Sequence, residues 1–327
     1  MDVPNPLGSP PEEHLFNSIF SAELMRRLDG VITSKSRFVH YTSAEVAMSI
    51  IQNAEIWMRN TTTMNDFSEV EHGQQCVREA WISSSGERLQ RALEAIHPGI
   101  AAEITERYDA WQPDMRSNTY ITCISEHPPE EDEYGRLSMW RAYGGIAGVA
   151  LVLNLTPFLA TTDELAAFSS PVFYGTGKDI EVRIDEMAAR LEQHGEELRK
   201  YGKSVLSENV FSALHFAALC TKHPAFREER EWRVIYSPNL AQSPVIKPVI
   251  RSVRGTPQTV QFLPLKHAPE VGLHHADIPS LVDRVIIGPT DNAWVLYEAF
   301  KRLLTDAGVQ NAHDRISVSQ IPLRHYS

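Results

Sequence analysis

The sequence is poor in cysteine and has no long run of apolar residues. Its three cysteines, Cys76, Cys123 and Cys220, are widely separated and form no C-x-x-C pair. This spacing excludes a disulfide framework and a zinc ribbon, and it indicates reduced thiols in a cytoplasmic protein. No stretch of the 327 residues approaches the roughly 18 consecutive apolar residues that a membrane span needs. We therefore expect no membrane partner.

An excess of positive charge is also missing. The formal net charge is −11, which disfavours a broad nucleic-acid-binding face, although a local basic groove would still allow a nucleic acid as partner. Several sequence patterns of common enzymes are absent as well: the Gly-rich dinucleotide fingerprint, the P-loop, H-E-x-x-H and G-x-S-x-G. A catalytic site must therefore be sought in less regular combinations of residues.

The order of apolar and turn residues predicts a single α+β domain. We interpret residues 1–36 as an N-terminal extension, with a disordered Pro-rich leader over 1–13 and an amphipathic helix over 14–29, and residues 37–327 as one catalytic-type domain. Strands are expected at 37–42, 56–59, 119–125, 148–153, 232–236, 283–288 and 316–321, with a hairpin within 245–264. Helices are expected at 44–53, 67–82, 87–108, 179–201, 203–220 and 291–307. This uneven order predicts a bent central sheet with outer helices, including those within 67–108 and 179–220.

A dense run of acids and bases leads into the strand predicted at 232–236. Alternate side chains of a strand share a face, so Glu229, Glu231 and Arg233 should point together, opposite Trp232. Two carboxylates and a guanidinium on one face suit the stabilisation of a developing cation, and Arg233 would keep Glu231 ionised. Taken alone, the same run is more typical of an edge strand protected by charge against aggregation.

The segment that begins the helix at 67–82 has two interpretations. Asp66, Glu69 and His72 recur at helical spacing near one face, where they could ligate a divalent metal. Asp66 as helix cap and Glu69 as its capping-box partner explain the first two residues without a ligand, so we assign no metal.

Two further segments contain possible ligand-binding side chains. His40 and Thr42 share one face of the first strand, near its end. Trp140 and Tyr143 lie one helical turn apart and precede a pair of glycines that would let a ligand approach the backbone. The two aromatic rings would provide either core packing or a stacking platform for a planar ligand.

In combination these segments resemble a large prokaryotic family catalogued as a domain of unknown function. The resemblance rests on three groups of residues and spans positions 37–325: His40-Tyr41-Thr42-Ser43 with Asn65-Asp66-x-x-Glu69, Cys123-Ile124-Ser125 with Met139-Trp140-x-x-Tyr143, and Phe226-x-x-Glu229-x-Glu231-Trp232-Arg233. The family brings no settled activity with it.

The order of these elements is also distantly similar to the ADP-ribosyltransferase superfamily. That resemblance implies an ADP-ribosyltransferase-like fold and NAD as substrate, cleaved at the nicotinamide–ribose bond. His40 and Thr42 would bind the nicotinamide ribose and the adenosine side, and Tyr143, beside Trp140, would contact nicotinamide. Glu231 or Glu229 would contact the ribose 2′-hydroxyl, with Arg233 in support. The protein would then be an ADP-ribosyltransferase or NAD glycohydrolase with an unknown acceptor, and a toxin or phage-defence effector in the cell.

These assignments predict that His40, Tyr143 and Glu231 meet in one cleft, with Glu231 partly buried beside Arg233. Two other functions stay open. One is a metal-dependent hydrolase or nuclease that uses Asp66, Glu69 and His72. The other is a sensor module that binds a nucleotide without turning it over.

Overall fold

The computed structural model of the protein describes residues 11–63, 68–159, 163–253 and 255–322. Its strands are β1 (Arg37–Ser43), β2 (Glu55–Asn60), β3 (Tyr120–His127), β4 (Gly148–Leu153), β5 (Ala167–Pro171), β6 (Phe173–Tyr174), β7 (Thr221–Lys222), β8 (Glu231–Tyr236), β9 (Lys247–Val253), β10 (Thr256–Pro264), β11 (Val282–Ile287) and β12 (Ile316–Val318). Its helices are α1 (Pro11–Phe20), α2 (Ala22–Thr33), α3 (Ala44–Asn53), α4 (Ser68–Trp81), α5 (Ser84–Ile96), α6 (Ile100–Ser117), α7 (Leu137–Met139), α8 (Gly177–Leu198), α9 (Lys203–Cys220), α10 (Ile278–Leu281) and α11 (Ala293–Asp306). None of the helices in these ranges has the length and apolar character needed to cross a membrane.

The predicted α+β class is confirmed by a mixed ten-stranded sheet. Its main order is β12-β11-β4-β1-β3-β2-β10-β9, and β8 pairs with β3 on one side and β5 on the other. Because β8 occupies one edge of β3 along Tyr120–Ser125, β1 and β2 must share the other edge. They pair with opposite ends of β3, at 125–127 and at 120–121. Among the described residues, β1 and β2 therefore pair with β3 but not with each other, and the sheet divides into two branches at this edge. The predicted hairpin is also present, as β9 and β10.

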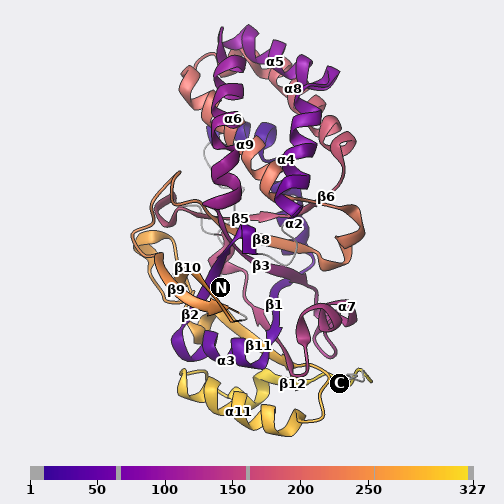
Figure 1. The fold of residues 1–327 in the computed structure, drawn as a ribbon, viewed down its shortest axis with the longest axis vertical. Coiled ribbons are helices and arrows are strands. Elements are labelled where there is room, and N and C mark those ends of the chain that lie inside the picture. Colours follow the sequence, from indigo (N-terminus) through magenta and orange to yellow (C-terminus); the bar gives the residue numbers. More distant parts are fainter. Residues whose placement is uncertain (1–10, 64–67, 160–162, 254, 323–327) are drawn as a thin grey trace.

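The helices α4, α5, α6, α8 and α9 gather at one end of the molecule, the upper end in Figure 1. They form an apolar cluster of their own, to which the sheet adds mainly Ile121 and Ile235. These helices therefore pack mostly on one another, where we expected outer layers on the sheet. The helix expected over 87–108 is two helices, because Gly99, with φ of 77°, interrupts the periodic pattern between α5 and α6.

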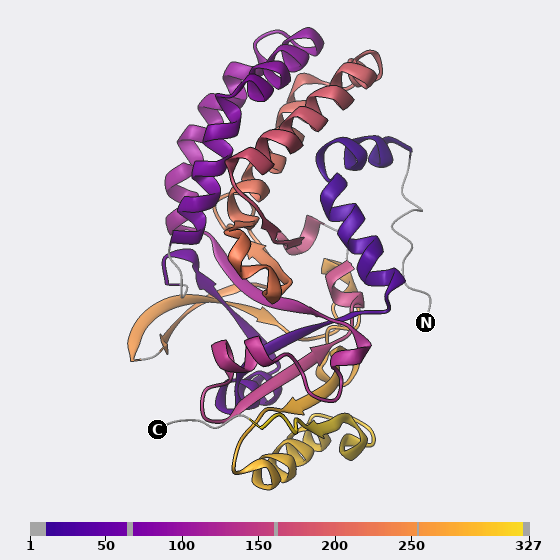
Figure 2. The same ribbon diagram turned by 90° about the vertical axis from the view of Figure 1, so that its right-hand side faces the viewer.

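The N-terminal segment is part of the fold. Two helices that meet at Ser21 replace the single helix expected over 14–29, and α1 already begins at Pro11, inside the expected leader. Residues 1–10 lie outside the described ranges. Figure 2 shows α1 and α2, in indigo, at the side of the molecule. Ile19 of α1 belongs to the helical cluster and Leu24 of α2 packs against the core of the sheet, so this segment joins the two.

Close contact between α4 and α9 depends on Gly73. A Cβ added there would lie 1.9 Å from the Ala218 carbonyl oxygen of α9. We expect Gly73→Ala to lower the free energy of unfolding by about 1–3 kcal/mol, measured by urea denaturation, because the helices must move apart. The control is Gly30→Ala in α2, where a Cβ meets nothing within 4 Å and the better helix propensity should add about 0.5–1 kcal/mol. Equal effects of both substitutions would contradict this account.

Candidate functional site

A group of buried and half-buried charged side chains lies near the N-terminal end of α4. It consists of Glu69 from α4, Lys222 from β7, Glu229 at the end of the 3-10 turn Pro224–Glu229, and Glu231 and Arg233 from β8. We call these five residues the carboxylate cluster.

The two cations of the cluster each contact more than one acid. The Lys222 Nζ lies 2.8 Å from Glu69 Oε1, 2.6 Å from Glu229 Oε2 and 3.1 Å from Glu231 Oε2. The Arg233 Nε lies 2.8 Å from Glu231 Oε1, and its Nη2 pairs with Glu69. With every group ionised, three carboxylates face two cations, which leaves one negative charge in excess.

Backbone conformation explains how neighbours in sequence reach one cluster. Arg230 adopts a left-handed conformation with φ of 45° and separates the turn that holds Glu229 from the strand that starts at Glu231. Alternation along β8 then places Glu231 and Arg233 on one face. Trp232 points to the other, where its Nε1 donates to Glu126 and its ring packs on Phe38. The predicted grouping of Glu229, Glu231 and Arg233 agrees with these contacts.

The environments of the two neighbouring carboxyls shift their pKa values in opposite directions. Burial disfavours the charged form of Glu231, but Arg233 and Lys222 outweigh it and lower its pKa from 4.5 to about 2. Burial raises the pKa of Glu229 above 4.5, and the contact with Lys222 only partly offsets this. The side chain of Glu229 keeps 16% of its surface exposed, against 6% for Glu231. Glu229 is thus the most exposed of the three acids in the cluster.

Two tyrosines border the acids. The Tyr143 hydroxyl donates to Glu229 Oε1 at 3.2 Å, and the Tyr174 hydroxyl accepts from the Glu231 backbone N–H at 2.8 Å. Burial raises the pKa of both phenols, so both stay protonated and act as hydrogen-bonding groups. Tyr143 was expected from the sequence. Tyr174 and Lys222 were not.

Of Tyr174 and Lys222, only Lys222 could have been identified from the sequence. Lys222 precedes the acidic and basic run by a few residues, and extending that run upstream would have included it. Tyr174 belongs to a two-residue strand without charge or periodicity, and nothing in the sequence marks it.

His40 and Thr42 do not join the cluster. The register pairs Val39 with Ser125, and Ser125 with Glu231, so these three share a face and the even-numbered residues of β1 lie on the opposite one. The His40 Nδ1 lies 2.9 Å from the Cys123 carbonyl oxygen, in the gap between β1 and β2. The expected convergence of His40, Tyr143 and Glu231 is therefore limited to Tyr143 and the acids.

Trp140 does not offer a stacking face. It is 1% exposed, its ring meets Tyr41 edge-on at 4.8 Å, and its Nε1 donates to the Tyr134 carbonyl. These contacts correspond to the core-packing interpretation of the two aromatic residues.

The metal hypothesis receives no support from the residues that can be placed. Asp66 lies outside the described ranges. The two carboxylate oxygens of Glu69 face Lys222 and Arg233, and the His72 Nε2 lies 3.0 Å from the Gly175 carbonyl oxygen. Within the described ranges no group of His, Cys, Asp and Glu side chains is arranged to hold a metal ion.

Comparison with known proteins identifies one family. Residues 139–234 match the model of a family described as "Protein of unknown function (DUF2971)". No curated protein and no solved structure matches the chain. The match includes Tyr143, Lys222, Glu229, Glu231 and Arg233, and it is shorter than the span of 37–325 that the motifs suggested. The chain thus carries, at residues 139–234, a DUF2971 domain, in agreement with the resemblance to a domain of unknown function.

Proposed function

We propose that the protein is an enzyme that breaks a ribosyl glycosidic bond, with NAD as its substrate and Glu229 as the carboxylate that faces the ribose. One observation carries the proposal: a partly exposed carboxyl, Glu229, lies beside a buried carboxylate, Glu231, that two cations hold in place. Neighbouring carboxyls whose environments separate their pKa values are typical of acid–base sites.

Each group of the cluster has a role in this chemistry. Cleavage between nicotinamide and ribose passes through an oxocarbenium-like state, which a carboxylate beside the sugar stabilises. Glu229 would supply that charge, and Tyr143 would orient it through their hydrogen bond. Glu231 and Arg233 are buried, and we assign them the positioning of Lys222 and Glu229.

The resemblance to ADP-ribosyltransferases supports the choice of NAD, and an ADP-ribosyltransferase-like fold is part of the same proposal. The adenosine end of the substrate needs binding residues other than His40 and Thr42, because these lie on the opposite face. Whether ADP-ribose passes to an acceptor or to water decides between transferase and glycohydrolase.

The proposal predicts release of nicotinamide when the purified protein is incubated with NAD, followed by liquid chromatography. A chelator should not change the rate. Because burial raises the pKa of Glu229 and the ionised form is the active one, the rate should fall on acidification at a higher pH than for an ordinary glutamate. NAD binding without nicotinamide release would favour the nucleotide sensor, and inhibition by a chelator would favour the metal-dependent hydrolase.

A further inference from the structure

A large cavity lies beside strands β3, β5 and β8. Its volume is about 1190 Å³, larger than the roughly 300–1,000 Å³ typical of small-molecule sites. Thr122 of β3 and Trp232 of β8 form part of its wall, and α2 closes it from the side of the N-terminus. The cavity therefore shares β8 with the proposed active site, and its lining lies on both faces of this strand: Trp232 on one, and Ile235 on the face that also holds Glu231 and Arg233.

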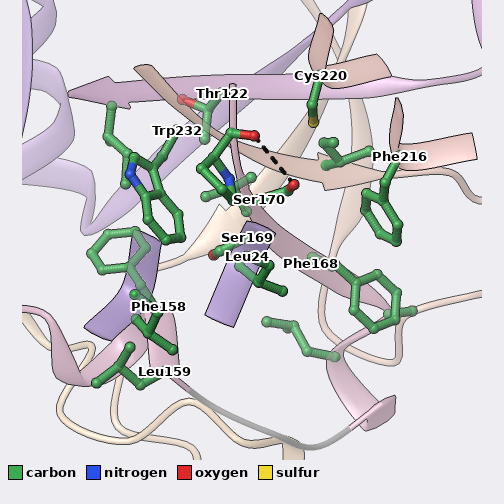
Figure 3. A pocket seen from close by; sticks show the side chains of 18 of the residues that line it. Leu24, Thr122, Phe158, Leu159, Phe168, Ser169, Ser170, Phe216, Cys220 and Trp232 are labelled. Atoms are coloured by element: carbon green, nitrogen blue, oxygen red, sulfur yellow. Dashed lines mark hydrogen bonds between the residues drawn. The ribbon is translucent and has the colours of Figure 1, made fainter. Parts of the chain in front are cut away.

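The wall of the cavity is mainly apolar. Figure 3 shows aliphatic and aromatic side chains around the central space, contributed by α2, β5, β8, α9 and the segment before β5: Leu24, Phe158, Leu159, Phe168, Phe216 and Trp232. Among the described residues β5 pairs with no strand other than β8, so its second edge is free, and cavity-lining residues lie on both of its faces. Ser169 and Ser170 come from this strand (Figure 3). A space of this shape and composition fits a flexible hydrocarbon chain.

One cation of the wall forms no close ion pair among the described residues, although Glu186 lies near enough to act on its charge. Of the two arginines that line the cavity, Arg107 pairs with Glu208 at 2.6 Å. Arg183 stacks its guanidinium on the Phe173 ring at 4.5 Å and forms no ion pair within the described parts of the chain. Burial, and then the nearby charge of Arg26, lowers the pKa of Arg183, a penalty that an anion beside it would relieve.

We propose that this cavity binds a long-chain carboxylate, with the hydrocarbon chain along the apolar wall and the carboxylate paired with Arg183. A single unpaired cation matches a single negative charge, whereas a dinucleotide pyrophosphate would need more donors than Arg183 supplies. The inference is independent of the proposed enzyme activity, since none of the five cluster residues lines the cavity.

Isothermal titration of the full chain with dodecanoate and with dodecanol tests this assignment. The wild type should bind one dodecanoate per chain and bind dodecanol more weakly. Arg183→Met keeps a long apolar stem against Phe173 but removes the charge, so it should weaken dodecanoate binding about tenfold, with dodecanol unaffected. Arg190→Met serves as the matched control on α8, because Arg190 donates to the Ser18 carbonyl and does not line the cavity.

A second variant tests whether the two ligands bind inside the cavity or elsewhere on the protein surface. Ser169→Trp should fill part of the space and weaken both ligands, while its thermal unfolding midpoint shows that the fold is retained. The proposal is overturned if dodecanoate does not bind, if Arg183→Met binds it as tightly as the wild type, or if Ser169→Trp leaves binding unchanged. Competition between NAD and dodecanoate would assign the cavity to the nucleotide and would likewise overturn it.

Discussion

Replacing Glu231 by glutamine should lower the free energy of unfolding by about 3–5 kcal/mol, the usual cost of breaking a buried ion pair. The carboxylate of Glu231 contacts Arg233 through one oxygen and Lys222 through the other, and Arg233 is fully buried. A neutral amide would leave both cations with less counter-charge in a place where water cannot compensate. Urea denaturation at pH 7 measures the effect. The control is Glu192→Gln, which removes a partner of Arg88 on the exposed surface and should leave the midpoint nearly unchanged.

The effect of Glu231→Gln should depend on pH in a defined direction. The pKa of Glu231 falls from 4.5 to about 2 on folding, so its carboxylate stabilises the folded state fully above pH 4.5. This stabilisation is lost progressively as the pH falls from 4.5 through about 2, and it is absent only below that pH, where the group is protonated in both states. The difference in stability between wild type and variant should therefore shrink over this window. An equal difference at pH 7 and at pH 2.5 would show that lost packing, and not lost charge, causes the destabilisation.

Replacing Glu229 by glutamine should reduce turnover of NAD by about a hundredfold or more, because the amide lacks the charge that stabilises an oxocarbenium-like state. Stability at pH 7 should stay unchanged or rise, since burial raises the pKa of Glu229 and so disfavours its charged form in the folded protein. This combination of lost turnover and retained stability distinguishes Glu229 from Glu231. If overexpression of the wild type is toxic to cells, the Glu229→Gln variant should be harmless.

Glu228→Gln is the matched control for this substitution. Glu228 is the exposed neighbour of Glu229, and it meets Arg136 through its backbone carbonyl. It should retain both turnover and toxicity. Full activity of Glu229→Gln would refute the assignment of the ribose contact to this residue, and activity lost only in Glu231→Gln, with the fold intact, would transfer the contact to Glu231.

The sequence predicts most of the local structure, and it does so wherever a pattern depends on neighbours along the chain. Alternation along a strand is enough to separate Glu231 and Arg233 from Trp232. The boundaries of α9 coincide with the prediction of 203–220, because apolar residues continue to its end. The break at Gly99 was missed, since the apolar periodicity of residues 87–108 runs across it.

What the sequence could not supply is the relation between distant strands. Alternation along β1 predicts only that His40 and Thr42 share a face. Which residues of β3 and β8 share that face depends on a register in which Val39 opposes Ser125, and no local pattern encodes it. The same holds for Glu69, whose contacts with Lys222 and Arg233 require α4 to dock near a strand more than a hundred residues later.

Glu69 lies outside the matched family region, and this limits which part of the chain could fold on its own. The matched family region, residues 139–234, contains both cations of the cluster but not this acid. It also contains β4, β5 and β8 without β1 and β3, the strands that connect β4 to β8 in the sheet. Expressed alone, this region would have an interrupted sheet and an arginine without one of its two counter-ions. Its borders mark a stretch of recognisable sequence, whereas the smallest autonomous unit must include the chain back to β1.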